Sequence, residues 1–274
     1  MIIDLCLEDS EPFAERQALI DAAQAGDADA KATLGDLFRI GDEFTDQDFE
    51  EAIRWYRRAA VQAHAGAQNN LGAMYAHGLG VPQDTAIAAE WYREAAEYGL
   101  VTAQSNLGLS YLYGDGVEQD DAEAAAWLSR AALQGHVVAT GQLGVLFRFG
   151  RGVERNIVAA AQLHVKAAIA GDVVSIGNLA SYYKEIEHEA LSGSLRAALA
   201  LAKIFNSGLG VEPNPVVGFA WILWGGRYGR RDDDENARRD QYELFLQCYS
   251  DLSQSERDES HTLVERMRLR LEQP

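Results

Sequence analysis

A unit of about 36 residues recurs through most of this chain of 274 residues. Leu-Gly pairs stand at positions 71–72, 107–108 and 143–144, with an earlier pair at 34–35 and a Leu-Ala pair at 179–180. Such a period is typical of chains that stack copies of one small motif. A single copy cannot bury its apolar side alone, so each copy must pack on the next.

Two helices account for the spacing inside each unit. Ala67, Leu71 and Tyr75 are four residues apart, which places them on one face of a first helix, here called helix A. Ala88, Trp91 and Ala95 do the same for a second helix, helix B. A Gly-x-Gly-Val segment separates the two helices at 78–81, 114–117 and 150–153, and glycine tolerates the positive φ that a tight turn needs.

Glycine also occurs inside helix A, as at Gly72 and Gly108. A mid-helix glycine costs about 1 kcal/mol relative to alanine, so its recurrence predicts an approach too close for a Cβ. Gly99 and its counterparts are expected just past the end of helix B, in left-handed backbone. Trp91 is expected to bury on the order of 200 Å². At ~25 cal/mol/Å² that burial corresponds to about 5 kcal/mol, so Trp91→Ala should unfold at least its local units.

The combined pattern is Ala-x-x-x-Leu-Gly-x-x-Tyr-x-x-Gly-x-Gly-Val, followed by Ala-x-x-Trp-Tyr-x-x-Ala-Ala-x-x-Gly. It resembles the Sel-one-like repeat, a relative of the tetratricopeptide repeat, over roughly residues 27–228. The resemblance implies an all-α fold: a right-handed superhelical α/α solenoid of helix pairs with helical caps. It also implies that the A helices line a concave face.

Departures from the pattern predict the organisation of the chain. We expect an N-terminal capping helix within 1–26. Repeats 1 to 4 and helix A of repeat 5 should occupy 27–183, and an irregular break from a deleted helix B should span 184–196. The last repeat is expected at 197–228 and capping helices at 229–274. Of these last helices, one carries Tyr242, Phe245, Cys248 and Tyr249, and the other begins with the capping-box pattern Ser253-Gln254-Ser255-Glu256.

A formal net charge of −18 argues against binding nucleic acid or anionic membranes, which requires clustered Lys and Arg. It favours a protein or peptide partner, with a basic partner suited best. Cys6 and Cys248 stand at opposite ends of the chain, so a disulfide framework is not expected. We find neither a recognisable signal peptide nor an apolar stretch long enough to enter a membrane. The expected location is the cytoplasm, or the periplasm if a leader was trimmed.

No motif for chemistry emerges. Gly-x-Gly lacks the preceding strand and the third glycine of a phosphate loop, and it recurs as the turn between the two helices of a repeat. His188-Glu189 begins like a zinc-protease motif, but Ser192 stands where the second histidine would be. The acidic run from Asp42 to Glu51 lacks a calcium loop's central glycine and regular oxygen ladder, and it suits a helix start. We therefore expect no metal, no cofactor and no enzymatic activity.

The best functional candidate is the concave face that the resemblance implies. Asn70, Asn106, Gln142 and Asn178 share one repeat position, and a row of amides can hydrogen-bond the backbone of an extended peptide. The alternative is that these amides bond to neighbouring helix turns. The predicted partner-binding set comprises Asn69, Asn70, His77, Asn106, Tyr113, Gln142, Arg148, Asn178, Ser181 and Lys184.

Three roles are consistent with these features, and they are given from the most to the least expected. The first is a non-enzymatic interaction scaffold that binds a protein or peptide on the concave face. The second is an immunity protein that neutralises a secreted antibacterial effector, as some members of the resembled family do. The third is a β-lactam hydrolase, which the resemblance disfavours because the cysteines found in each repeat of the relevant members are missing here.

Overall fold

The computed structural model describes residues 11–42, 45–229 and 235–272, and over these ranges it is helical with only one isolated bridge, Asp42 to Thr45. This confirms the predicted all-α class. The A helices are α2 (Ala28–Ile40), α4 (Ala65–His77), α6 (Val101–Tyr113), α8 (Val137–Phe149), α10 (Val173–Leu191) and α11 (Leu195–Ser207). The B helices are α3 (Phe49–Ala60), α5 (Thr85–Glu97), α7 (Asp121–Leu133), α9 (Ile157–Ile169) and α12 (Pro215–Tyr228).

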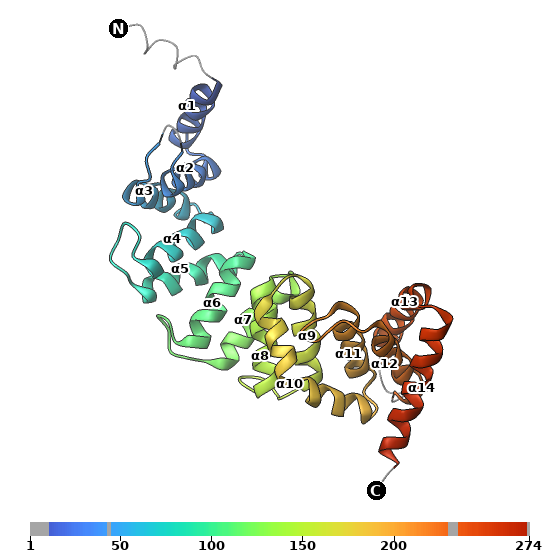
Figure 1. The fold of residues 1–274 in the computed structure, drawn as a ribbon. Coiled ribbons are helices and arrows are strands. Elements are labelled where there is room, and N and C mark those ends of the chain that lie inside the picture. The colour runs from blue at the N-terminus through green and yellow to red at the C-terminus, as the bar shows by residue number, and fades with distance from the viewer. Residues whose placement is uncertain (1–10, 43–44, 230–234, 273–274) are drawn as a thin grey trace. The chain divides into compact units, whose positions relative to one another are not determined.

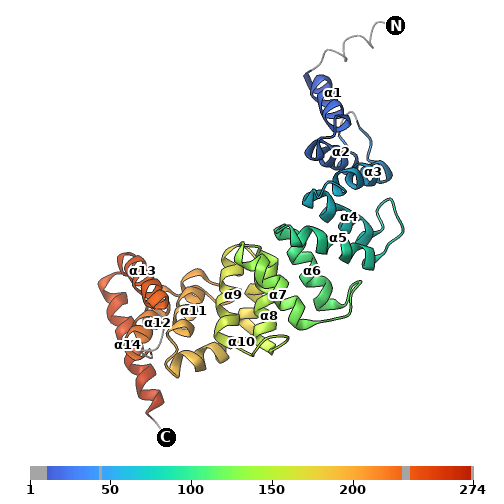
Figure 2. The ribbon, with the colours of Figure 1, turned by 180° about the vertical axis from the view of Figure 1, so that it is seen from behind.

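The helices form two compact units, Met1–Gln134 and Gly135–Pro274. In the first unit, α1 (Glu11–Gln24) packs on α2, and the pairs α2–α3, α4–α5 and α6–α7 follow one another in chain order (Figures 1 and 2). Each B helix also contacts the A helix of the next pair, α3 against α4 and α5 against α6. The stacking of successive pairs that the repeat predicts is therefore present within this unit.

The two glycines of the Gly-x-Gly turn have different structural roles. Its first glycine ends helix A: Gly78 has φ 67°, and its N–H donates to the carbonyl of Met74. Its second glycine allows the turn to approach the preceding repeat. A Cβ on Gly80 would lie 2.7 Å from the Phe49 backbone, and a Cβ on Gly116 would overlap the Thr85 carbonyl. Consecutive turns of the first unit therefore lie against the starts of α3 and α5.

The glycine inside helix A faces the helix B of its own pair. A Cβ on Gly35 would lie 2.5 Å from the Tyr56 ring, and one on Gly72 would lie 2.7 Å from the Tyr92 ring. Leu128 and His164 fill the same position opposite Gly108 and Gly144. The expected lack of room for a Cβ is thus confirmed in four pairs. The neighbour is chiefly a side chain of helix B.

This arrangement corrects the role expected of Trp91. Tyr92 is buried in the core of its repeat, whereas Trp91 is only half-buried at its edge. Tyr92 follows Trp91 directly, and its ring faces Gly72 of helix A. The larger indole ring of Trp91 therefore lies beside the core. The cost of about 5 kcal/mol for Trp91→Ala stays a prediction, and the partial exposure of the indole favours a lower cost than at a fully buried tryptophan.

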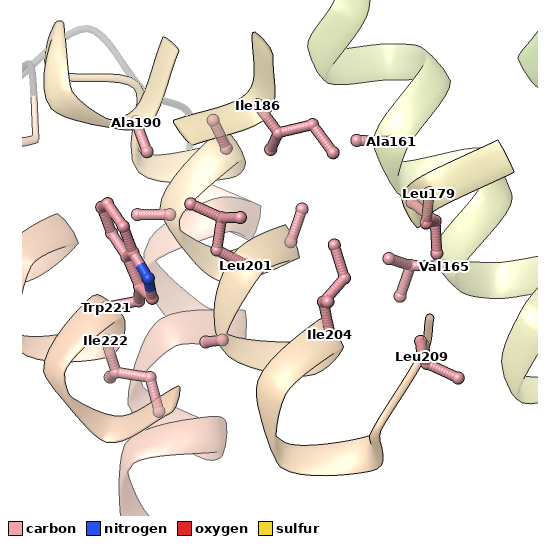
Figure 3. Close-up of a cluster of buried hydrophobic side chains, with 14 of the residues drawn as sticks. Ala161, Val165, Leu179, Ile186, Ala190, Leu201, Ile204, Leu209, Trp221 and Ile222 are labelled. Carbon is pink, nitrogen blue, oxygen red and sulfur yellow. The ribbon is translucent and has the colours of Figure 1, made fainter. Parts of the chain in front are cut away.

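The second unit contains α8–α9, α10, α11–α12 and two terminal helices, α13 (Glu235–Asp251) and α14 (Gln254–Leu271). Its core is continuous from α9 to α12. Figure 3 shows Val165, Leu179 and Ile204 meeting on one side, with Leu201 and Trp221 further along. Trp221 and Trp224 are 1% and 2% exposed, so the deeply buried tryptophans of the described residues both lie on α12.

The fifth repeat has no helix B. Its helix A, α10, continues to Leu191 with one non-helical residue at Tyr182, and α11 begins at Leu195. Most of the segment 184–196, expected to be irregular, is therefore helical. The Trp224 indole N–H donates to the Ala190 carbonyl at 3.0 Å, which ties the end of α10 to α12. In place of the missing helix, α11 contacts α9 directly.

The expected terminal helices are present, and Ser253 and Glu256 form both hydrogen bonds of the capping box. Phe245, Cys248 and Met267 pack against the core of the second unit. On α13, Tyr249 packs against the rings of Phe219 and Phe245, while Tyr242 is largely exposed. Ser10, the expected cap of α1, lies outside the described residues.

We expect Trp221→Ala to lower the unfolding free energy of the second unit by about 3–5 kcal/mol, the range for a large buried aromatic side chain. Trp91→Ala should cost less in the first unit, because its indole is partly exposed. Guanidinium denaturation followed by circular dichroism measures both values. A loss at Trp91 equal to that at Trp221 would contradict the assignment of the core.

Candidate functional site

The predicted amide row connects consecutive A helices in the first unit. The Asn106 side-chain N–H donates to Asn69 Oδ1 at 3.0 Å, joining α6 to α4. The Asn70 side-chain N–H donates to Asp36 Oδ1 at 3.1 Å, joining α4 to α2. Asn70 and Asn106 thus bond to neighbouring helices, which is the alternative to direct contact with a peptide. Each amide has two N–H groups and an oxygen, so one such bond leaves further capacity for a ligand.

Asp36 is the centre of this polar row, and the sequence analysis did not include it. Its Oδ1 accepts hydrogen bonds from Tyr56 Oη at 2.6 Å, from Asn70 at 3.1 Å and from Arg39 at 3.3 Å. Burial, followed by the bond to Asp36, raises the pKa of Tyr56 well above its usual value. Asp36 could not be found from the repeat because the same position holds Ala73 and Leu109 in the next two copies.

His77 and Tyr113 are both exposed, and each is the last residue of its helix A. Ile40 holds the same position in the first repeat and is also exposed. All three are followed by a glycine with positive φ. The first unit therefore presents one accessible large side chain per repeat at the point where helix A meets its turn.

In the second unit, Arg148 and Ser181 come together. The guanidinium donates to Ser181 Oγ at 2.7 Å, and its Cζ lies 4.3 Å from the centre of the Tyr182 ring. Glu185 lies 4.0 Å from Arg148 and pairs with Arg155 at 2.7 Å. Arg148 thus links α8 to the non-helical residue of α10. Its charge is already engaged by α10, which leaves less of it to attract a partner.

The other predicted residues of the second unit are less connected. Lys184 is exposed, while Gln142 and Asn178 are half-buried on α8 and α10. The structure thus brings Asn69 and Asn106 together, and Arg148 and Ser181, while Lys184 lies apart at the surface. The assignment of all ten residues to partner binding stays a prediction.

A buried polar cluster lies in the second unit beneath these residues. Ser175 Oγ donates to Asp172 and lies 3.1 Å from His164 Nδ1. Both His164 and Ser175 are fully buried. Burial lowers the pKa of His164 to about 4, with Asp172 opposing and Arg148 reinforcing the shift. The carboxylate accepts from the serine and the serine has no path to solvent, so the cluster lacks the geometry of an activated nucleophile.

The described ranges contain no group of three or more His, Cys, Asp or Glu side chains placed to hold a metal ion. Within the same ranges, no helix has the length and apolarity needed to cross a bilayer. Asp48, from the acidic run, caps α3 by accepting from the Glu51 N–H at 2.9 Å. That part of the run has the helix-start role expected from its position.

The comparison with protein families finds repeats at the positions of the helix pairs. The Sel1 repeat model matches residues 28–64, 65–99, 101–136, 138–172 and 195–223, which together cover more than half of the chain. This chain belongs to the Sel1 repeat family. The matches omit 173–194, the region of α10 and its missing helix B. Sel1 repeat proteins generally mediate protein–protein interactions.

Solved structures agree with the family. A protective antigen present in uropathogenic Escherichia coli strains, displaying an SLR fold, is 30% identical with a TM-score of 0.60. The match covers 85% of this chain but only 56% of that one. A Sel1 repeat protein from Oxalobacter formigenes is 26% identical with a TM-score of 0.56, covering 80% and 98% of the two chains.

An immunity protein from Pseudomonas aeruginosa is 22% identical with a TM-score of 0.40, over 85% of this chain and 73% of that one. A similarity at this level carries no argument about role. The search of curated proteins gives no match.

Proposed function

We propose that this Sel1 repeat chain is a non-enzymatic scaffold that binds a protein or peptide segment along the face formed by its A helices. The polar row of the first unit carries the proposal. Asn106 and Asn69, and then Asn70 and Asp36, join three successive A helices through side chains that keep unused donors and acceptors.

An extended backbone has donors and acceptors along its length that such a row can satisfy. Because the amides are already held by neighbouring helices, they lose little conformational freedom when a partner binds. The exposed residues at the ends of α2, α4 and α6 add contact area beside the row. These features support a long, shallow contact with a protein chain in preference to a small molecule.

The experiment is capture of partners from the native cell with the full chain as bait, followed by mass spectrometry. A bait with Asn70, Asn106, Gln142 and Asn178 all changed to Ala should bind the captured partner about tenfold more weakly, because it loses the amides that a backbone would contact. A matched control changes Glu90 and Glu94, exposed on α5, to Ala and should bind like the wild type.

Circular dichroism must show that both variants stay folded. A correctly folded quadruple variant with unchanged affinity would exclude the amide row as the contact. A wild-type bait that recovers no specific partner would contradict the scaffold role itself. Recovery of a secreted toxic effector would instead favour the immunity role predicted second.

A further inference from the structure

Charge is distributed very unevenly between the two units. Residues 1–134 contain 24 acidic and 8 basic residues, a net charge of −16, whereas residues 135–274 contain 18 and 16, a net charge of −2. Nearly all of the excess negative charge therefore belongs to the first unit. An attraction to a cationic partner would act there.

Within the first unit, much of this charge lies in the turns that follow the A helices. Residues 41–48, 78–85 and 114–121 contain nine acidic residues and no basic one. Three of the nine, Asp48, Asp84 and Asp120, cap the following B helices. Asp46, Asp115 and Glu118 are exposed and cap no helix.

The turns form a continuous edge because the second and third each pack on the start of the helix that follows the preceding turn. Gly80 approaches Phe49 and Glu50, and Gly116 approaches Thr85 and Ala86. Ile40, His77 and Tyr113 stand at the beginning of the three turns. We call these three residues and the described turn residues at 41–42, 45–48, 78–85 and 114–121 the turn edge of the first unit.

The nearby cations are already engaged. Arg16 donates to the Thr45 hydroxyl of the first turn. Arg39 bonds to Tyr56 Oη at 3.1 Å and to Asp36. Arg93 lines one hollow with Glu118 and Asp120 and donates to Tyr111 Oη at 3.1 Å. The turn edge therefore combines exposed apolar and aromatic side chains with exposed carboxylates, of which Asp46, Asp115 and Glu118 cap no helix.

We propose that the turn edge of the first unit is the docking surface for a basic, partly apolar segment of the partner protein. Its lysine or arginine side chains pair with the acidic turns and cover the Tyr113 ring, and its apolar residues contact Ile40. This deepens the proposed function by naming the chemistry of the segment and its place on the chain.

The second unit supplies a natural control for the charge. At the positions of Asp115 and Gln119, the fourth repeat has Arg151 and Arg155. The two turns share the same glycine positions, and all four glycines have positive φ between 66° and 77°. Asp115→Arg with Gln119→Arg therefore changes the net charge of the turn at 114–121 from −4 to −1, with residues that the fold already accepts at the equivalent sites.

The test uses the full chain and a fluorescein-labelled peptide of 12 alternating Lys and Leu residues, measured by fluorescence anisotropy at several salt concentrations. Wild type should bind it, and the affinity should fall as salt rises. The Asp115→Arg/Gln119→Arg variant should bind about tenfold more weakly, because it removes one carboxylate and places two cations where the basic segment would dock. Tyr113→Ser should also weaken binding without altering the net charge.

The reciprocal control, Arg151→Asp with Arg155→Gln, makes the whole chain more negative but leaves the turn edge unchanged. Its affinity should stay within about twofold of wild type, since the acidic turns and Tyr113 are unchanged. Equal and opposite effects of the two swaps would show attraction to net charge alone and overturn the proposal. So would equal binding of a peptide with Glu in place of Lys.

The failure of this inference can be told from failure of the scaffold role. If the captured native partner binds the Asp115→Arg/Gln119→Arg variant as tightly as wild type, the turn edge is not the docking surface, and the scaffold role stands. If wild type captures no partner, the scaffold role fails, whatever the synthetic peptide does.

Discussion

Gly116→Ala should lower the unfolding free energy of the first unit by about 3 kcal/mol, the sum of backbone strain and a steric conflict. Gly116 has φ 76°, where any Cβ is disfavoured. A Cβ at this position would also overlap the Thr85 carbonyl, which is backbone at the start of α5 and cannot move without displacing that helix. The second effect acts between adjacent repeats, so the loss should spread beyond the turn.

Gly99→Ala is the matched control for this substitution. Gly99 has φ 87° but no atom within 4 Å of an added Cβ, so only the backbone strain applies. Its cost should be about 1 kcal/mol, reduced further because alanine restricts the unfolded chain. Both losses are measured by guanidinium denaturation of the full chain. Equal losses at the two glycines would show that the turn does not depend on close approach to α5.

Acidification from pH 7 to pH 4 should cost the second unit about 3 kcal/mol through His164 alone. The pKa of His164 is about 4 in the folded chain against an ordinary value of 6.5, because burial disfavours the charged ring. The unfolded chain therefore binds a proton at a higher pH than the folded one. The stability that His164 contributes is complete above pH 6.5 and is lost progressively as the pH falls toward 4.

The charged groups around His164 do not remove this effect. Asp172, which accepts from Ser175, favours the protonated ring, while Arg148 disfavours it. Tyr182 packs edge-on at 5.9 Å between ring centres and has a pKa raised by burial. The fully buried position of His164 sets the direction of the shift.

His164→Leu isolates the contribution of the histidine. Leucine occupies the equivalent position in the third repeat, where Leu128 packs on Gly108. The variant should lose about 3 kcal/mol less than wild type between pH 7 and pH 4, while the carboxylates of the chain respond equally in both. Denaturation curves at a series of pH values give the difference. Parallel pH profiles for the two proteins would show that His164 is not held neutral by burial.

The helix pairs could be predicted because each repeat carries its own local signals. The spacing of Leu71 and Tyr75 gives a helical face, and Gly78 has the positive φ that its place in the turn predicts. Repetition then reinforces each signal, since a pattern that recurs every 36 residues is unlike a chance match. The glycines inside helix A similarly indicated close packing before the structure identified Tyr56, Tyr92, Leu128 and His164 as the neighbours.

The features that the sequence could not predict depend on positions whose residue differs from one repeat to the next. Trp91 and Tyr92 are adjacent and both aromatic, so spacing alone did not decide which one fills the core. Asp36 and His164 occupy positions held by apolar or aromatic residues in most other repeats, so the repeat pattern gives no hint of their partners. The course of α10 through residues 184–191 depends on packing such as the Trp224 bond to Ala190.

The central claim is that the A helices and their turns hold the protein partner. Hydrogen–deuterium exchange of the full chain, free and bound to its captured partner, tests this most directly. We predict slower exchange on binding in α4, in α6 and in the turn at 114–121, with the B helices α5 and α7 changed little. Protection confined to α5 and α7, or to α13 and α14, would contradict the claim.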